Sequence, residues 1–160
     1  MGTFAASIVT PTAVAGTLKT FCQISAGFAH TLAIEKNGRL WSWGFNSYGQ
    51  LGASTAFSRN VPATVTGAVK TFCQIMAAGS NSFAVDKNGR VWAWGENFSG
   101  QLGASRVSEN SPVSILGAVK TFCQIAAGAT FSLAIAKNGR AWGWGFNTGG
   151  LLGDNTDRKS

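Results

Sequence analysis

The sequence predicts an all-β fold of three β-propeller blades, each about 50 residues long and built from four short antiparallel strands. Three observations lead to this prediction. The chain of 160 residues repeats one unit, because KTFCQI recurs at 19–24, 70–75 and 120–125. Apolar and polar residues alternate along each unit with the period of two that is typical of strands. An Asn-Gly pair separates two such runs in every copy and predicts a hairpin turn.

Each repeat has the same parts in the same order. The boundaries are expected at about 11–61, 62–111 and 112–160, within one repeat domain that spans 1–160. A segment with proline comes first, followed by the TFCQI strand, the hairpin, a Gly-rich tail and a polar loop. A single sheet of this size cannot bury both of its faces, so we expect the copies to stack face to face.

The hairpin is the best-defined part of the unit. In the first copy, Leu32 and Ile34 precede the turn, and two tryptophans follow it at the same spacing of two. Asn-Gly favours a type I′ turn, in which both central residues have positive φ. The turn residues are Asn37, Gly38, Asn88, Gly89, Asn138 and Gly139. The large side chains expected to fill the space between blades are Trp41, Trp43, Trp92, Trp94, Trp142 and Trp144.

A longer pattern spans Ala26 to Gly52 and recurs in the other two copies: A-G-x-x-H-T-L-A-I, then N-G-R-L-W-x-W-G-x-N, then G-Q-L-G. It resembles the regulator-of-chromosome-condensation repeat family across almost the whole chain. The resemblance implies a propeller, typically seven-bladed, that acts as a binding scaffold in exchange factors, ubiquitin ligases, a photoreceptor and a β-lactamase inhibitor. Asn81 and Phe131 depart from the histidine of the pattern, and Leu151 departs from its glutamine.

The number of repeats predicts that the chain associates with itself. Closed propellers hold about 4–8 blades, so three blades cannot close a ring and leave two apolar faces open. A proline segment lies near the start of the sequence, and the polar loop near its end leads toward the place of a further one. We expect copies to join head to tail into a closed ring or a filament. The interface candidates are Pro11, Val14, Leu151, Leu152 and Asp154.

Positive charge follows the repeat. The chain has 13 Lys and Arg against 6 Asp and Glu, a formal net charge of +7. A lysine precedes each TFCQI strand, and further basic residues flank the hairpin turns: Lys36, Arg39, Lys87, Arg90, Lys137 and Arg140. In a propeller these residues form a basic rim. The rim is either a surface for a polyanion such as nucleic acid, or a solvated edge whose charge prevents strand pairing.

No motif in the sequence predicts an enzyme, a cofactor or a metal site. Nucleophile-elbow, P-loop and zinc-protease motifs are absent, and Ala136 breaks the carboxylate series of Glu35 and Asp86. His30 is expected to form a hydrogen bond within its own blade. The cysteines are expected to be small buried residues that form no disulfide, since each blade holds one; they are Cys22, Cys73 and Cys123.

Two polar segments, 53–60 and 104–110, differ between copies while their flanks do not. Loops on a rigid scaffold often carry binding, so the candidate contacts are Phe57, Arg59, Arg106 and Glu109. No signal peptide or membrane span is evident, and free cysteines favour the cytoplasm.

Four interpretations stay open at this point. The first is a structural protein that assembles head to tail, and the second is a protein-binding module or inhibitor that uses the variable loops. The third is a binder of polyanions, and the fourth is an excised or engineered piece of a longer propeller.

Overall fold

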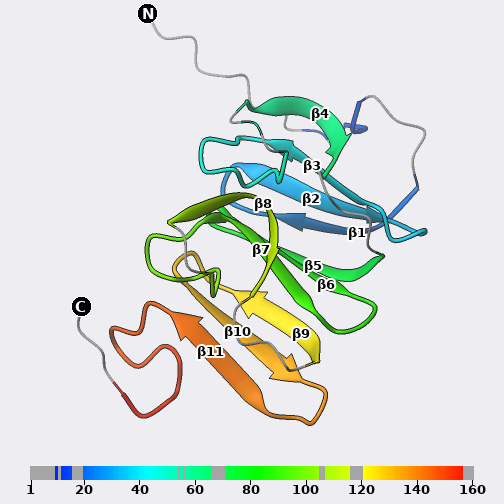
Figure 1. Cartoon of the computed structure of the whole chain (residues 1–160). Helices are drawn as coiled ribbons and strands as arrows, with labels where there is room; N and C mark the ends of the chain where they lie inside the picture. The colour runs from blue at the N-terminus through cyan, green and yellow to red at the C-terminus, as the bar shows by residue number, and fades with distance from the viewer. Residues whose placement is uncertain are drawn as a thin grey trace, which may run out of the picture.

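Three antiparallel sheets stack one on the next in the computed structural model (Figure 1). The first sheet contains β1 (Phe21–Ala26), β2 (His30–Glu35), β3 (Leu40–Gly44) and β4 (Arg59–Thr64). The second contains β5 (Phe72–Ala78), β6 (Asn81–Asp86), β7 (Val91–Glu96) and β8 (Ser108–Ser114). The third contains β9 (Phe122–Ala127), β10 (Phe131–Ala136) and β11 (Ala141–Gly145). The structure describes residues 10, 12–15, 20–53, 55, 57–65, 71–104, 107–115 and 121–156.

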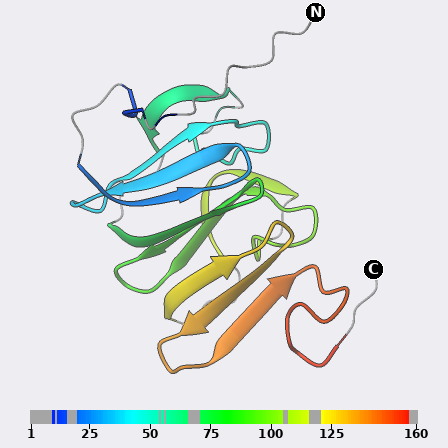
Figure 2. The ribbon, with the colours of Figure 1, turned by 180° about the vertical axis from the view of Figure 1, so that it is seen from behind.

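The described residues form strands and turns without a helix, so the all-β prediction is confirmed. Each sheet is a meander in which strands adjacent in sequence pair with one another. The view from behind shows the same stack, with the second sheet between the other two (Figure 2). Within the described part of the chain, the third sheet has three strands where the other two have four.

The proline segment completes the sheet that precedes it in the chain. β4 carries Pro62 and pairs with β3, with Thr64 opposite Trp41. β8 pairs with β7 in the same way, with Ser114 opposite Trp92. The boundary expected near residue 61 therefore falls inside β4. A sheet begins with the TFCQI strand and ends with the proline strand of the following sequence repeat.

The hairpin turns are not of type I′. In the first hairpin, Glu35 and Arg39 close a three-residue loop, because Glu35 N donates to Arg39 O at 3.0 Å and Gly38 N donates to Glu35 O at 2.8 Å. Gly38 has a φ of 83°, while Asn37 has no positive φ. This is a type I turn followed by a left-handed glycine, the usual three-residue hairpin. Asn37 uses its side chain, since its Oδ1 accepts from Arg39 N at 2.9 Å.

Each sheet has two faces, which we name by the residues they carry. The leucine face carries Leu32 in the first sheet, and the tryptophan face carries Trp43 and its equivalents. The leucine face of the first sheet packs on the tryptophan face of the second, in a cluster of Leu32, Ile34, Leu40, Val65, Phe72, Ile75, Ala77, Ala84 and Trp94. The second and third sheets pack in the same sense, in a cluster of Phe83, Val85, Val91, Ala93, Leu102, Ile115, Phe122, Ile125, Ala134 and Ala136.

Candidate interaction surfaces

The two joints between sheets share a set of hydrogen bonds. At the first joint, Trp94 Nε1 and Ser82 Oγ of the second sheet donate to the carbonyl oxygen of Gln50, at 2.9 and 2.7 Å. At the second joint, Trp144 Nε1 and Ser132 Oγ donate to the carbonyl oxygen of Gln101, at 2.9 and 2.8 Å. A buried carbonyl with two donors is well satisfied. One sheet thus supplies a backbone acceptor, and the next supplies an indole and a hydroxyl.

The hairpin glycines form a second contact at each joint. Phe72 N donates to Gly38 O at 3.1 Å, and Phe122 N donates to Gly89 O at 2.7 Å. A Cβ on Gly89 would lie 2.9 Å from the carbonyl oxygen of Phe122. Glycine is therefore required at Gly89 by the approach of the next sheet as well as by its own positive φ.

The six tryptophans lie in three pairs along the stack. Trp92 and Trp94 lie at the first joint, and Trp142 and Trp144 lie at the second. Trp41 and Trp43 lie on the tryptophan face of the first sheet, where no other sheet of the described chain covers them. Their rings contact Phe21, with centroids 6.5 and 6.2 Å away.

Equivalent residues differ in exposure between the joints and the open faces. Ile24, on the open tryptophan face of the first sheet, is 65% exposed, whereas its equivalents Ile75 and Ile125 are 8% and 3% exposed. On the open leucine face of the third sheet, Ile135 is 40% exposed, whereas its equivalent Ile34 is 2% exposed. A hollow of about 250 Å³ lies on this second face, lined by Gln124, Ala126, Leu133, Ala134, Ile135 and Ala141.

The interface candidates from the sequence lie near the two ends of the stack. Val14 is 48% exposed and Leu151 is 43% exposed, while Leu152 is half-buried. Asp154 is exposed, and its Oδ1 accepts from Asn147 Nδ2 at 3.0 Å. Pro11 lies outside the described residues.

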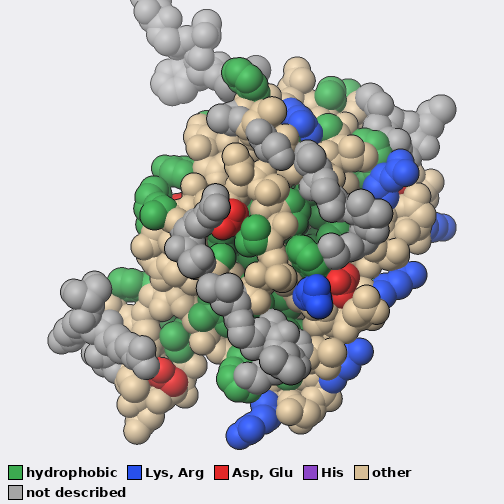
Figure 3. Space-filling model, in the orientation of Figure 1, with side chains coloured by type: hydrophobic (Ala, Val, Ile, Leu, Met, Phe, Trp, Pro, Cys, Tyr) green, Lys and Arg blue, Asp and Glu red, His purple; other side chains and the backbone are tan. Residues whose placement is uncertain are grey.

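The basic residues gather on one edge, which we call the hairpin rim and define by residues 36–39, 87–90 and 137–140. Figure 3 shows Lys and Arg side chains in a row along this edge of the stack. All six predicted basic residues are exposed there: Lys36, Arg39, Lys87, Arg90, Lys137 and Arg140. The Arg90 guanidinium lies 5.9 Å from the centroid of the Trp92 ring. The lysines that precede the TFCQI strands lie outside the described residues.

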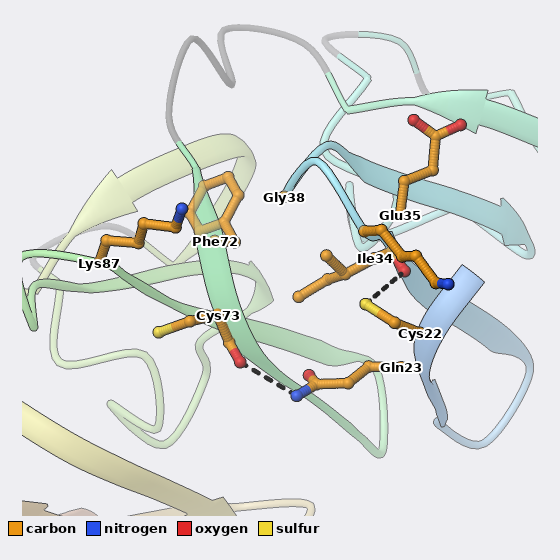
Figure 4. Close-up of a pocket in the computed structure, with 9 residues that line it drawn as sticks. Cys22, Gln23, Ile34, Glu35, Gly38, Phe72, Cys73 and Lys87 are labelled. Carbon is orange, nitrogen blue, oxygen red and sulfur yellow. Dashed lines mark hydrogen bonds between the residues drawn. The ribbon is translucent and has the colours of Figure 1, made fainter. Parts of the chain in front are cut away.

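A pocket of about 220 Å³ opens between the first and second sheets near the hairpin rim (Figure 4). Gln23 crosses it, and its Nε2 donates to the carbonyl oxygen of Cys73 at 3.0 Å. Lys87 lies beside Phe72 on one side, and Cys22 lies on the other. The pocket is part of the first joint, where a side-chain amide ties one TFCQI strand to the next.

The cysteines are exposed and free, so the prediction that they are buried is wrong. The reason is a bulge in the TFCQI strands. In the first sheet Phe21 pairs with Glu35 and Gln23 pairs with Ile34, which leaves Cys22 as the extra residue. A bulge redirects the side chain of its extra residue. Cys73 occupies the same place in β5, between Phe72 and Gln74.

The opposite edge of the stack, which we call the loop rim, is formed by the segments that follow β3, β7 and β11. Tyr48 and Phe98 meet edge to face there, with ring centroids 6.0 Å apart, and Phe98 is 65% exposed. Phe57 is exposed, whereas Arg59 and Glu109 are half-buried at equivalent positions of β4 and β8. Arg106 lies outside the described residues. Sequence reasoning missed Tyr48 and Phe98, although variation between copies at these positions was a signal.

His30 links two sheets, so the expectation of a bond within its own blade is wrong. Its Nε2 lies 2.9 Å from Ser82 Oγ of the second sheet. The single proton of the Ser82 hydroxyl goes to Gln50 O, so His30 Nε2 carries the proton and donates. Burial lowers the pKa of His30 from 6.5 to about 4. His30 is therefore a neutral part of the first joint.

Among the described residues, no group of three or more His, Cys, Asp or Glu side chains is placed to hold a metal ion. No helix in this part of the chain is long and apolar enough to cross a membrane.

Comparison with known proteins agrees with this architecture. Two models of the regulator of chromosome condensation (RCC1) repeat match the chain, one at residues 21–50, 74–101 and 122–150 and the other at 37–85 and 88–135. The chain belongs to the RCC1 repeat family. The family predicted from the sequence is thus confirmed, together with its propeller-type sheets.

The similar RCC1 proteins are much longer than this chain. Human HERC3, named a probable E3 ubiquitin-protein ligase, is 40% identical over 89 residues, which are 54% of this chain and 8% of the ligase. The mitochondrial RCC1 domain-containing protein RUG3 of Arabidopsis thaliana is 38% identical over 82 residues, which are 51% of this chain and 18% of that protein. The chain therefore spans less than a fifth of either relative.

Solved RCC1 structures share the fold. Human WBSCR16 superposes with a TM-score of 0.79 at 23% identity, over 89% of this chain and 37% of that one. Yeast RCC1 (Prp20), solved in complex with Kap60, superposes with a TM-score of 0.71 at 25% identity, over 86% of this chain and 35% of that one. Another structure of Prp20p, from Saccharomyces cerevisiae, was described with its binding to Gsp1p and histones.

Proposed function

We propose that this chain is a non-enzymatic interaction module whose copies join head to tail, with the tryptophan face of one copy stacked on the leucine face of the next. The observation that supports it is the exposure of Ile24, at 65%, against 8% and 3% for Ile75 and Ile125. An isoleucine that is buried at two joints and open at the third position marks a face suited to a further sheet.

The two open faces complement each other, because the same pair of faces already forms both joints inside the chain. Each joint places a tryptophan face on a leucine face. A second copy would place its Ile24 and Phe21 against the hollow beside Ile135 on the first copy. The contact continues an interface that the fold already uses twice, and it is heterologous, as head-to-tail assembly requires.

The hydrogen bonds of the joints also have counterparts at the open faces. Trp43 and Thr31 occupy the positions of Trp94 and Ser82, and Leu151 occupies the position of Gln50. The acceptor at each internal joint is a backbone carbonyl, so leucine in place of glutamine preserves it. A second copy can thus donate from Trp43 Nε1 and Thr31 Oγ1 to the carbonyl oxygen of Leu151.

Two copies supply six blades, within the range of about 4–8 that closed propellers hold. A ring of two copies is the smallest assembly in which no face stays open. A filament is the alternative product of the same joint, formed when the rotation per copy does not close.

Substitutions on each face test the proposal. Ile24→Lys and Ile135→Lys should each raise the dissociation constant at least about 30-fold, because burial of an isoleucine contributes roughly 2 kcal/mol and a lysine cannot take its place. Sedimentation velocity across a wide concentration range measures this. Phe98→Lys is the matched control, since Phe98 is also 65% exposed but lies on the loop rim.

A mixture of the two face variants gives the sharper result. Each keeps one intact face, so Ile24→Lys chains and Ile135→Lys chains should pair with each other and stop at a dimer. A wild-type chain that stays monomeric at hundreds of micromolar would overturn head-to-tail joining. Face variants that associate as strongly as the wild type would overturn it equally.

A second candidate function is binding of another protein at the loop rim, in the manner of a protein-binding module or inhibitor. It is favoured by the exposed pair of Tyr48 and Phe98, since aromatic side chains are enriched at interfaces. Yeast Prp20, an RCC1 protein of this fold, is known in a complex with Kap60. Phe98→Ala together with Tyr48→Ala should reduce capture of a partner protein without changing self-association.

Binding of a polyanion is favoured by the row of exposed Lys and Arg on the hairpin rim (Figure 3). Retention on immobilised double-stranded DNA at low salt would support it, with a loss of affinity as salt rises. Arg39→Gln, Arg90→Gln and Arg140→Gln together should reduce the salt dependence by about three contacts. Absence of retention at low salt would exclude this function.

A further inference from the structure

The third sheet has an open edge as well as an open face. In the first and second sheets, the strand that carries the tryptophans pairs with a fourth strand, β4 or β8. β11 carries Trp142 and Trp144, and no fourth strand pairs with it among the described residues. Its unpaired N–H and C=O groups form a template for one more strand.

The sequence contains a third segment of the type that forms β4 and β8. Residues 7–16 read SIVTPTAVAG, against SRNVPATVTG at 58–67 and SENSPVSILG at 108–117. All three begin with serine, have proline fifth and end with glycine. Edge strands tolerate proline, as β4 and β8 already do. Residues 7–16 therefore have the pattern of a fourth strand without a sheet to complete.

The spacing to the following sheet is the same in all three cases. Thr64 and Phe72 are eight positions apart, as are Ser114 and Phe122, and so are Ala13 and Phe21. In the two internal cases this link carries the chain from the fourth strand of one sheet to the first strand of the next. The third link has the right length for the same step.

Within one chain this strand is at the wrong end of the stack. Both ribbon views show residues 12–15 near β4, on the far side of the molecule from β11 (Figures 1 and 2). Val14 is 48% exposed, whereas Val65 and Ile115, its equivalents, are 5% and 7% exposed within the two hydrophobic clusters. A side chain that is buried at both internal joints is thus open here.

We propose that residues 8–13 of a second copy add to β11 as the fourth strand of the third sheet, and that Val14 of that copy is buried in the joint. This inference rests on the head-to-tail joining proposed above, which brings the start of one copy next to the third sheet of the other. The occupant is a named segment of the same protein, and strand addition supplies backbone hydrogen bonds that face stacking alone does not.

The internal pairs fix the register. Trp41 pairs with Thr64 and Ser42 with Ala63, so Trp142 pairs with Ala13 and Gly143 with Thr12 of the second copy. Val65 N donates to Leu40 O at 3.1 Å, and Ile115 N donates to Val91 O at 3.3 Å. The matching bond runs from Val14 N of the second copy to Ala141 O.

Cysteine cross-linking tests this register. In a background with serine at the three native cysteines, chains with Thr12→Cys are mixed with chains with Gly143→Cys and oxidised. Residues opposite one another on antiparallel strands lie within disulfide range, so the mixture should give a covalent dimer. Ala13→Cys with Gly143→Cys is the control, because residue 13 faces the other side, and its dimer yield should be about tenfold lower.

Val14→Lys gives an independent measurement. It should weaken association about tenfold or more, because a charged side chain cannot occupy the site of a buried valine. Thr10→Lys is its control, since Val61, the residue equivalent to Thr10, is 44% exposed in β4. Association without cross-linking, and without an effect of Val14→Lys, overturns strand addition and leaves face stacking in place. Absence of any association overturns both proposals.

Discussion

The second and third sheets are near copies in sequence, yet they differ in how much of each is buried. All six residues of β6 in the second sheet are buried, whereas the equivalent strand β10 alternates between buried and partly exposed residues. The second sheet has a neighbour on each face and four strands, and the third has one neighbour and three. The stability of a blade therefore depends on its neighbours, as in other repeat proteins.

The largest expected effect comes from tryptophans at equivalent positions. Trp94→Ala should lower the free energy of unfolding by about 3–5 kcal/mol, because it leaves a large cavity. It also removes the donor to Gln50 O, and Trp94 is fully buried. Trp43→Ala, on the open face, should lower it by about 1–2 kcal/mol in dilute solution. Urea unfolding measures both, and equal losses would contradict the contrast between joint and open face.

The next effect concerns pH, because the first joint contains His30 and the second has no titratable side chain in its place. The pKa of His30 is about 4 in the folded chain and 6.5 when unfolded. The unfolded chain therefore binds a proton first as pH falls. Stability is fully present above pH 6.5 and decreases toward pH 4, by about 3 kcal/mol.

Unfolding experiments between pH 4 and pH 7 measure this slope. His30→Asn, which introduces the residue found at the equivalent Asn81, should remove it. A slope that persists in that variant would assign the effect to another group.

The smallest effect separates two glycines that have the same backbone conformation. Gly89 and Gly139 have φ of 81° and 82°, so alanine at either should destabilise the fold by about 1 kcal/mol through backbone strain. Gly89→Ala should add roughly 1–2 kcal/mol, because its Cβ would meet the carbonyl oxygen of Phe122. No atom lies within 4 Å of a Cβ at Gly139. Thermal unfolding of the two variants checks this, and equal losses would count against a close contact at the joint.

If a second copy covers the third sheet, Gly139 gains the neighbour that Gly89 already has. Gly139→Ala should then weaken self-association while it changes the stability of the monomer little. A variant that associates like the wild type would place Gly139 outside the joint between copies.

Sequence reasoning predicted the architecture because the signals for it are local. The period of two around Leu32 and Trp43, the Asn-Gly pairs and the triple repeat specify hairpins of about 50-residue units without knowledge of distant contacts. It predicted the wrong turn type, because the loop that closes between Glu35 and Arg39 has three residues and places only glycine at positive φ. The position of Cys22 was also wrong, because a bulge moves it to the surface.

The sequence by itself determined that the chain is a series of identical β units with the motif of RCC1 repeats, since short-range patterns decide strands and turns. Tertiary structure alone decided which face of each unit meets which, because that depends on contacts between residues about 50 positions apart. It placed the proline strand in the preceding sheet and moved His30 into the joint with Ser82. It also showed that Ile24 and Ile135 are exposed where their equivalents are buried, which no local pattern could reveal.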